Sequence, residues 1–307
     1  MPVSNFPGGF AAGVTIRGVP VTVTNPGNGY WVDSGAGSNG NKGTQDRPWA
    51  TIDYAIGRCT ASNGDIIFVK PGHAETVSAA GGIACDVAGI AIIGLGKGSL
   101  RPTITLDTAA TASVTISAAN VTLHNLRFIA GFADITRIID VTSTDAHIDA
   151  CEFVESAADL NWVDVIDASG ADNTADGLTV TGCRAFGVDA ACDSFIEITG
   201  DISRLTVQDC LVVHDHANAT ALIEQATGKD MINVDIQRNS YHSLKTSGDI
   251  LIDNDTTANS GIVAFNNASH ATTTAEVLVD ADGVGLIENR ATGVITASGY
   301  LLPAADS

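Results

Sequence analysis

Six acidic residues recur at one position of a repeated apolar pattern, each directly after an Ile or a Val. They are Asp140, Asp167, Glu197, Glu224, Asp253 and Asp280. If the repeats form parallel strands in register, these side chains, here called the acidic column, stack about 4.8 Å apart on one face. Neighbouring carboxylates at that spacing repel by about 1 kcal/mol even in water. Solvent, a cation, basic groups of another subunit or raised pKa values must relieve the repulsion.

We interpret the acidic column first as a solvated face, with a subunit interface or a cation or ligand groove as alternatives. Two carboxylates about 5 to 9.5 Å apart could also cleave a glycosidic bond, and Glu197 with Glu224 would be such a pair. However, the 35 acidic residues make such pairs common. Aromatic platforms for a sugar are scarce, and Trp162 is the one attractive candidate. The sequence therefore predicts no catalytic residue and a protein that is not an enzyme.

The remaining chemical motifs are weak. His214-Asp215-His216 places two His on one strand face, but a metal site needs three or four ligands. The segment GLGKGS lacks Ser or Thr after Lys97 and is interpreted as a turn rather than a phosphate loop. The chain contains neither a GxSxG nor an HExxH motif. We therefore expect neither a metal nor a cofactor.

A repeated unit must position the acidic column. In each unit an apolar residue is followed three positions later by a small polar, thiol or apolar residue, at intervals in the twenties to low thirties. The pairs are Leu123/Leu126, Ile148/Cys151, Val180/Cys183, Val207/Cys210, Ile236/Asn239, Phe265/Ala268 and Leu286/Asn289. Short β-type runs with this period are typical of a solenoid, in which each unit buries its apolar residues against its neighbours. Cys151, Cys183 and Cys210 then form an inward ladder of structural thiols, continued by Asn239.

Composition limits the classes of partner. The net charge of −20 over 307 residues argues against nucleic acid and against an anionic membrane. No secretion signal is visible, and no apolar run reaches the length of a membrane helix. Short strands, tight turns and abundant Gly indicate an all-β chain. Without a secretion signal, the six cysteines are expected to be free buried thiols.

The sequence divides into four parts. Residues 1–29 are predicted to be an extended arm with one strand, at Val14–Ile16 or Val19–Val23, that docks on another surface because it is too apolar for a solvated tail. The proposed contact residues are Phe6, Phe10, Val14, Ile16 and Arg17. Residues 30–77 should hold a capping helix over Arg47–Cys59, with Pro48 in its first turn, and the first turn of the solenoid. Residues 78–295 form the solenoid body, and residues 296–307 a short tail.

The run YWVDSGAGSNGNKGTQDRPWATIDYAI, followed by GDIIFVKPGHAETV, resembles the start of right-handed parallel β-helix proteins of the pectate-lyase-like group. The matching residues are Pro48, Trp49, Thr51, Ile52 and Ala55, then Gly64, Asp65, Ile67, Val69, Pro71 and Gly72. The resemblance implies a right-handed, single-stranded parallel β-helix with an N-terminal capping α-helix and an extended N-terminal arm.

The opening NFPGGFAAGVTIRGVP further resembles the N-terminal segments of tailed-phage virion proteins with β-helix bodies. This second resemblance implies a homotrimeric virion protein, assembled in the host cytoplasm, with the phage major capsid protein or another virion protein as partner. Decoration of the capsid, as a head spike or cement protein, is the preferred role. The alternative is a tailspike-like receptor-binding protein or polysaccharide depolymerase that uses a carboxylate pair on the β-helix face.

Overall fold

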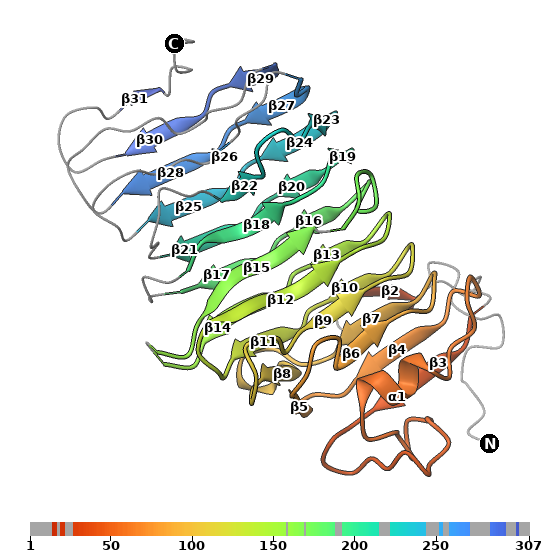
Figure 1. The fold of residues 1–307 in the computed structure, drawn as a ribbon. Helices are drawn as coiled ribbons and strands as arrows, with labels where there is room; N and C mark the ends of the chain where they lie inside the picture. Colours follow the sequence, from red (N-terminus) through yellow and green to blue (C-terminus); the bar gives the residue numbers. More distant parts are fainter. Residues whose placement is uncertain are drawn as a thin grey trace.

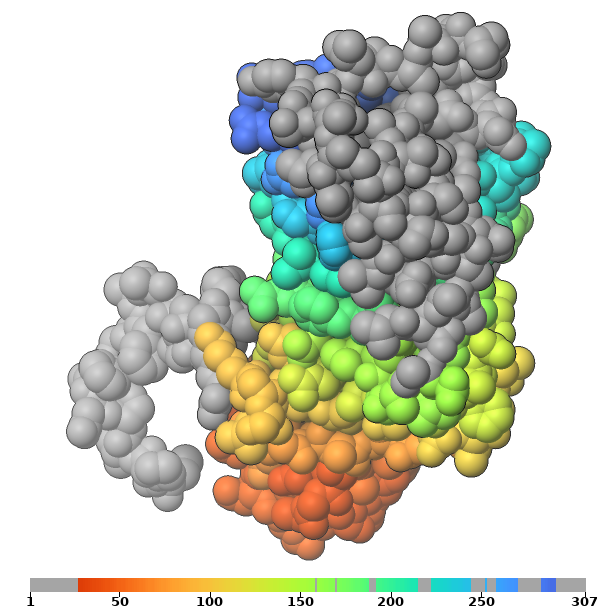
Figure 2. Space-filling view, turned by 90° about the vertical axis from the view of Figure 1, so that its left-hand side faces the viewer, coloured from red at the N-terminus to blue at the C-terminus, as the bar shows by residue number. Residues whose placement is uncertain are grey.

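The structure is a computed structural model. It describes residues 14–16, 19–21, 27–157, 159–168, 170–187, 192–214, 222–243, 252–253, 258–270, 283–292 and 299–300. The chain winds into a parallel β-solenoid whose turns pile up from the N-terminal end to the C-terminal end (Figures 1 and 2). This confirms the predicted parallel β-helix.

Three long sheets run along the solenoid. Sheet I, in spatial order, consists of β3 (Gly29–Val32), β4 (Ile66–Val69), β7 (Ala91–Gly94), β10 (Thr122–His124), β13 (His147–Asp149), β16 (Thr179–Thr181), β20 (Thr206–Gln208), β24 (Val234–Gln237), β27 (Gly261–Ala264) and β29 (Val284–Ile287). Sheet II consists of β5 (Ala74–Val77), β8 (Thr103–Leu106), β11 (Arg127–Ala130), β14 (Glu152–Glu155), β17 (Arg184–Phe186), β21 (Leu211–His214), β25 (Ser240–Ser243), β28 (Asn267–His270), β30 (Arg290–Thr292) and β31 (Gly299–Tyr300). Sheet III consists of β6 (Ile83–Cys85), β9 (Val114–Ile116), β12 (Ile135–Val141), β15 (Trp162–Ala168), β18 (Ser194–Ile198), β22 (Ile223–Gln225) and β26 (Ile252–Asp253).

A few short elements lie outside these sheets. β19 (Ile202–Ser203) and β23 (Met231–Ile232) form a parallel pair, and Gly98–Leu100 is a 3₁₀ turn, η1. In the arm, β1 (Val14–Ile16) and β2 (Val19–Val21) pair antiparallel. The sequence predicted only one of these two strands, and the correction is that both form. No helix among the described residues is long and apolar enough to span a membrane.

From β10 and β11 onward, one residue in the left-handed conformation lies at each corner between sheet I and sheet II. These corner residues, all with φ between 46° and 61°, are Asn125, Ala150, Gly182, Asp209, Arg238, Phe265 and Glu288. Asn, Asp and Gly tolerate this conformation best, because a short polar side chain or no side chain relieves the clash with the backbone. The solenoid therefore turns from sheet I to sheet II within two residues at these corners, which keeps successive strands in register.

A ladder of small residues fills the interior just after this corner. Its members are Cys151, Cys183, Cys210, Asn239, Asn266 and Asn289, and each is buried. The three Asn are joined: Asn239 Nδ2 donates to Asn266 Oδ1 at 3.0 Å, and Asn266 Nδ2 donates to Asn289 Oδ1 at 2.9 Å. The sequence placed this position at Ala268 in the sixth unit, which is wrong. Val263 pairs with Ile236, so the equivalent residue is Asn266.

The capping helix is shorter than predicted. Helix α1 spans Ile52–Ile56, at the N-terminal end of the stack (Figure 1), and not Arg47–Cys59. It begins at Ile52 because Thr51, in an extended conformation, accepts a hydrogen bond from the backbone N–H of Tyr54. Trp49 lies before the helix, where its backbone bridges Val32 and its indole N–H donates to the Asn41 carbonyl at 2.9 Å. The apolar spacing was therefore read correctly as a buried face, but the helix covers only part of it.

The cysteines are expected to resist alkylation until the chain unfolds. All six are free, and five are buried, with Cys59 partly exposed. Burial raises the pKa of the Cys59 and Cys85 thiols to about 12, and that of Cys183 well above its ordinary value. Because the thiolate is the nucleophile, iodoacetamide at pH 8 should label the native protein slowly and the denatured protein at all six sites. Mass spectrometry of the two samples gives the comparison, and rapid native labelling of the ladder thiols would contradict the structure.

Candidate active site

The acidic column stacks as the sequence predicts. On the outer face of sheet III, Asp140 pairs with Asp167 and Asp167 with Glu197. Glu197 pairs with Glu224, and Glu224 with Asp253. Asp280, the last predicted member, lies outside the described residues. Consecutive turns therefore bring carboxylates about one strand spacing apart, roughly 4.8 Å.

A second row of side chains lies beside the column because the alternation of inward and outward residues is interrupted. Two consecutive, fully buried residues precede each acid in β12, β15 and β18. The pairs are Ile138 and Ile139, Val165 and Ile166, and Phe195 and Ile196. In a regular strand, residues three apart face opposite sides. The extra inward residue shifts this alternation, so that Arg137, Asp164 and Ser194, themselves in register, reach the same face as the acids.

Asp164 and Glu197 form a pair of interacting carboxyl groups on adjacent strands. The charge of Glu197 acts on Asp164 and helps to raise its pKa. Ser194 holds Asp164 in place, since its backbone N–H and its hydroxyl both donate to Asp164 Oδ1, at 3.2 and 2.8 Å. Asp164 is only 5% exposed, whereas Glu197 is partly exposed. The pair therefore consists of one sheltered and one accessible carboxyl group.

Burial, and then the charge of Glu197, raise the pKa of Asp164 to about 8. Loss of solvation disfavours the ionised form, and a neighbouring carboxylate disfavours it further. The Ser194 hydrogen bonds act in the opposite direction but are the smaller effect. Asp164 thus keeps its proton at neutral pH, which is unusual for an Asp and is frequent at catalytic sites.

Arg137 neutralises the column one turn earlier. Its Nη1 lies 2.5 Å from Asp167 Oδ2 and 3.6 Å from Asp140 Oδ1. The carboxylate of Asp167 is almost completely buried, with 4% of its side chain exposed. The repulsion expected from the sequence is therefore relieved at Asp140 and Asp167 by an arginine of the same chain. Beside Glu197, the neighbouring carboxyl group of Asp164 has a raised pKa.

Sequence reasoning missed the three residues of the second row. Arg137, Asp164 and Ser194 each stand three positions before an acid of the column, inside an otherwise apolar strand. That repeated polar position was the signal that could have identified them. The predicted pair of Glu197 and Glu224 does lie on adjacent strands, but the carboxyl group with the raised pKa is that of Asp164, beside Glu197.

Other sequence candidates fall elsewhere. Trp162 is fully buried and packs on the His214 ring, with centroids 5.8 Å apart, so it is not the exposed sugar platform that the sequence suggested. His214 is also buried, whereas Asp215 and His216 lie outside the described residues. Of the proposed platform contacts, Val14 and Ile16 lie in β1, and Phe6, Phe10 and Arg17 lie outside the described residues. Within the described parts of the chain, no group of three or more His, Cys, Asp or Glu is arranged to hold a metal ion.

Comparison with known proteins gives fold-level likeness. No family model matches the sequence, and no curated protein does. A solved rhamnogalacturonan lyase is similar in structure, with 13% identity, coverage of 90% of each chain and a TM-score of 0.44. The GH136 lacto-N-biosidase from Eubacterium ramulus is also similar, with 11% identity, coverage of 87% of this chain and 68% of its own, and a TM-score of 0.30.

Both of these solved structures are carbohydrate-active enzymes by name, which contradicts the prediction that the chain is not an enzyme. That prediction was drawn from the scarcity of aromatic residues and the lack of a known motif. Neither observation bears on a site assembled from carboxyl groups of successive turns. At these identities and TM-scores the likeness concerns the fold, so the activity must be argued from the chain's own side chains.

Proposed function

We propose that the protein is a glycan-cleaving enzyme that uses Asp164 as its general acid and Glu197 as its second catalytic carboxylate. The observation that carries this proposal is the pair of Asp164 and Glu197. The pKa of Asp164 is about 8, and the charge of Glu197 accounts for part of its increase. A general acid works best when its pKa lies near the working pH. Two carboxyl groups whose surroundings separate their pKa values supply the acid and the base or nucleophile of glycoside cleavage.

The spacing of the pair favours hydrolysis with retention of configuration. Retaining enzymes hold their carboxyl groups about 5 to 5.5 Å apart, and inverting enzymes about 6.5 to 9.5 Å. Asp164 and Glu197 come from adjacent strands, which lie about 4.8 Å apart. A glycosidic oxygen beside them would accept the proton of Asp164. Glu224, one strand further on, would be the second carboxylate of an inverting enzyme.

The proposed reaction has two steps. First, Asp164 gives its proton to the glycosidic oxygen while Glu197 attacks the anomeric carbon, so that the C–O bond to the leaving sugar breaks and a glycosyl-enzyme ester forms. Then the Asp164 carboxylate takes a proton from water, the water oxygen attacks the anomeric carbon, and Glu197 is released. Ser194 orients Asp164 through both steps by its two hydrogen bonds to Oδ1.

Elimination from an acidic polysaccharide is less well supported by the side chains. A lyase of that kind needs a cation to neutralise the uronate carboxylate. Arg137 is the basic residue of this site, and it is already bound to Asp140 and Asp167. The acidic column would also repel a polyuronate. The arrangement therefore suits a neutral sugar at the bond that is cleaved.

The test is a screen of neutral and acidic polysaccharides with two readouts. We expect new reducing ends from a neutral or mostly neutral glycan, with the anomeric configuration of the first product retained, as followed by NMR. Unsaturated uronate, detected by its ultraviolet absorbance, would instead show a lyase. If the anomeric configuration of the first product is inverted, Glu224 and not Glu197 would be the second catalytic carboxylate. Absence of any cleavage across a broad glycan panel would contradict the proposal.

The phage origin, the homotrimer, the capsid or virion partner and the virion location stay predictions of the sequence resemblance. A polysaccharide depolymerase of the tailspike kind is compatible with them. The proposed contact between residues 1–29 and a virion platform can be tested by deleting that segment and measuring retention on purified particles.

A further inference from the structure

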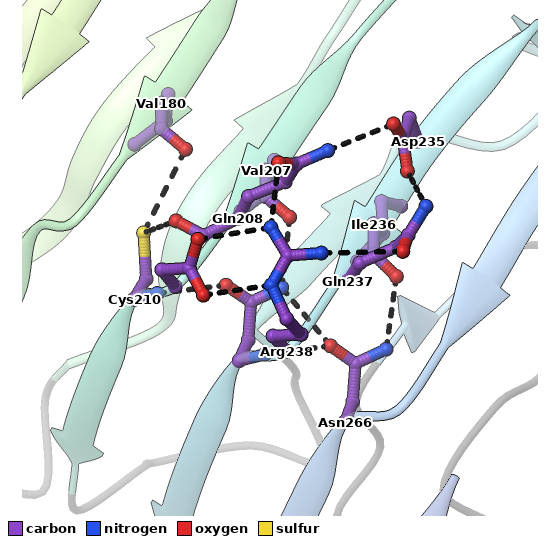
Figure 3. A network of polar contacts seen from close by, with 11 residues as sticks. Val180, Val207, Gln208, Cys210, Asp235, Ile236, Gln237, Arg238 and Asn266 are labelled. Carbon is purple, nitrogen blue, oxygen red and sulfur yellow. Dashed lines mark hydrogen bonds and ion pairs between the residues drawn. The ribbon is translucent and has the colours of Figure 1, made fainter. Parts of the chain in front are cut away.

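A network of fixed polar side chains lies on the outer face of sheet I, away from the acidic column. Gln208 and Gln237 are register partners on β20 and β24. Gln208 Nε2 donates to Asp235 Oδ2 at 2.8 Å, and Gln237 Nε2 donates to Asp235 Oδ1. One carboxylate therefore orients two neighbouring amides (Figure 3).

Arg238 closes this network from the corner of the solenoid. Its Nε and Nη2 donate to the two carboxylate oxygens of Asp209, both at 2.9 Å. Its Nη2 also donates to Gln208 Oε1 at 2.8 Å, and its Nη1 to Gln237 Oε1 at 3.4 Å (Figure 3). The planar guanidinium thus fixes both amides from the side opposite Asp235. Side chains that are held in this way lose little conformational entropy when a ligand binds.

An exposed aromatic residue stands directly beyond Arg238. Asp209, Arg238 and Phe265 are corner residues of consecutive turns, because Gln208, Gln237 and Ala264 before them are in register. Phe265 therefore lies about one strand spacing from Arg238, roughly 4.8 Å along the stack. Its side chain is 46% exposed although it is large and apolar. Ile262, which pairs with Asp235, is 43% exposed.

We propose that these residues form a second, non-catalytic glycan-binding site, whose ligand is a neutral sugar unit. The proposal takes its ligand class from the proposed function. The amides and the Asp235 carboxylate retain unused donors and acceptors after the internal hydrogen bonds are counted, and these suit pairs of sugar hydroxyls. The apolar, slightly positive C–H face of a sugar ring would stack on the negative face of Phe265. A few fixed polar groups beside an apolar platform are the usual composition of a small-ligand site.

The charges of the site argue for a neutral ligand. Asp209 and Asp235 outnumber Arg238, whose guanidinium is bound to Asp209. An anionic sugar would therefore meet net repulsion. Because the site lies on sheet I and the catalytic pair on sheet III, one polysaccharide chain can be held on one face while another segment is cleaved on the other.

The experiment measures binding without cleavage. In an Asp164→Asn chain, a neutral oligosaccharide series is titrated by calorimetry, and the same titration is repeated with Phe265→Ala or Gln237→Ala added. We expect each added substitution to raise the Kd for the oligosaccharide about tenfold. Phe132→Ala is the matched control, since Phe132 is also an exposed Phe, at 36%, and lies far along the chain between β11 and β12. It should leave the Kd unchanged.

The outcomes separate the two proposals. If Phe265→Ala weakens binding and the wild-type chain cleaves nothing, the second site stands and the proposed function fails. If Phe265→Ala leaves the Kd equal to that of Phe132→Ala, or if no oligosaccharide binds, the second site is overturned. If Phe265→Asp dissociates an oligomer and does not change glycan binding, this surface is a contact between copies of the chain. That result would also overturn the second glycan-binding site.

Discussion

Asp164→Asn is expected to lower kcat on the preferred glycan by about 10² to 10⁴-fold, the range that general acid catalysis contributes. The amide keeps the oxygen that accepts the two Ser194 hydrogen bonds, and it has nearly the same size and shape as the protonated carboxyl group. The substitution therefore preserves the shape of the site and removes only the proton that is transferred. Steady-state hydrolysis of the polysaccharide identified by the screen gives the measurement.

Glu288→Gln is the matched control for this substitution. Glu288 is an exposed corner residue after β29, and the change likewise converts a carboxylate into an amide. Its kcat should equal that of the wild-type chain. Equal activity of Asp164→Asn and Glu288→Gln would exclude Asp164 as the acid.

The pH dependence of activity and of stability, compared between the wild-type chain and Asp164→Asn, distinguishes an effect on catalysis from an effect on folding. In the wild-type chain, activity should fall as the pH rises through the pKa of Asp164, about 8, because Asp164 then loses its proton. Stability should change in the same window. Because the pKa of Asp164 is raised by folding, its stabilising contribution is complete below the ordinary Asp pKa and is lost as pH rises towards about 8. Asp164→Asn should therefore melt with a weaker pH dependence than the wild-type chain while remaining inactive.

Asn266→Ala is expected to destabilise the C-terminal turns by about 3 to 5 kcal/mol, because it leaves several buried polar groups without partners. The Asn266 carboxamide accepts hydrogen bonds from the backbone N–H and from the Nδ2 of Asn239, at 2.9 and 3.0 Å. It also donates to the Ile236 carbonyl at 3.0 Å and to Asn289. Alanine can make none of these contacts, and Asn266 is fully buried.

Hydrogen exchange should locate this loss. In a solenoid each turn contacts only its neighbours, so amide protection should fall around β24 to β29 and persist from β4 to β12. Asn267→Ala is the matched control, since Asn267 is the next residue, also an Asn, and exposed. It should shift the unfolding free energy by less than about 0.5 kcal/mol. A uniform loss of protection along the whole chain would contradict the ladder as a local element.

Several features could be read from the sequence because the fold is periodic. An apolar run followed by an acid, repeated along the chain, is enough to predict that Asp167 and Glu197 become vertical neighbours. The inward position of Cys151, Cys183 and Cys210 follows from the same repeat. The prediction from sequence was wrong at Ala268, because the motif was counted there without knowing how the strands pair. There, the exposed Phe265 at the corner was taken for the inward apolar residue that is in fact Val263.

The proposed chemistry depended on the tertiary structure. Simple alternation puts Asp164 and Asp167 on opposite faces of β15, and only the consecutive inward residues Val165 and Ile166 bring both to the outer face. The raised pKa of Asp164 then arises from its burial and from the charge of Glu197 on the next turn. The sequence by itself determined the stack and its acidic column, because both follow from a repeat. Only the folded chain decided which carboxyl group keeps its proton, because burial and the two consecutive inward residues place Asp164 beside Glu197.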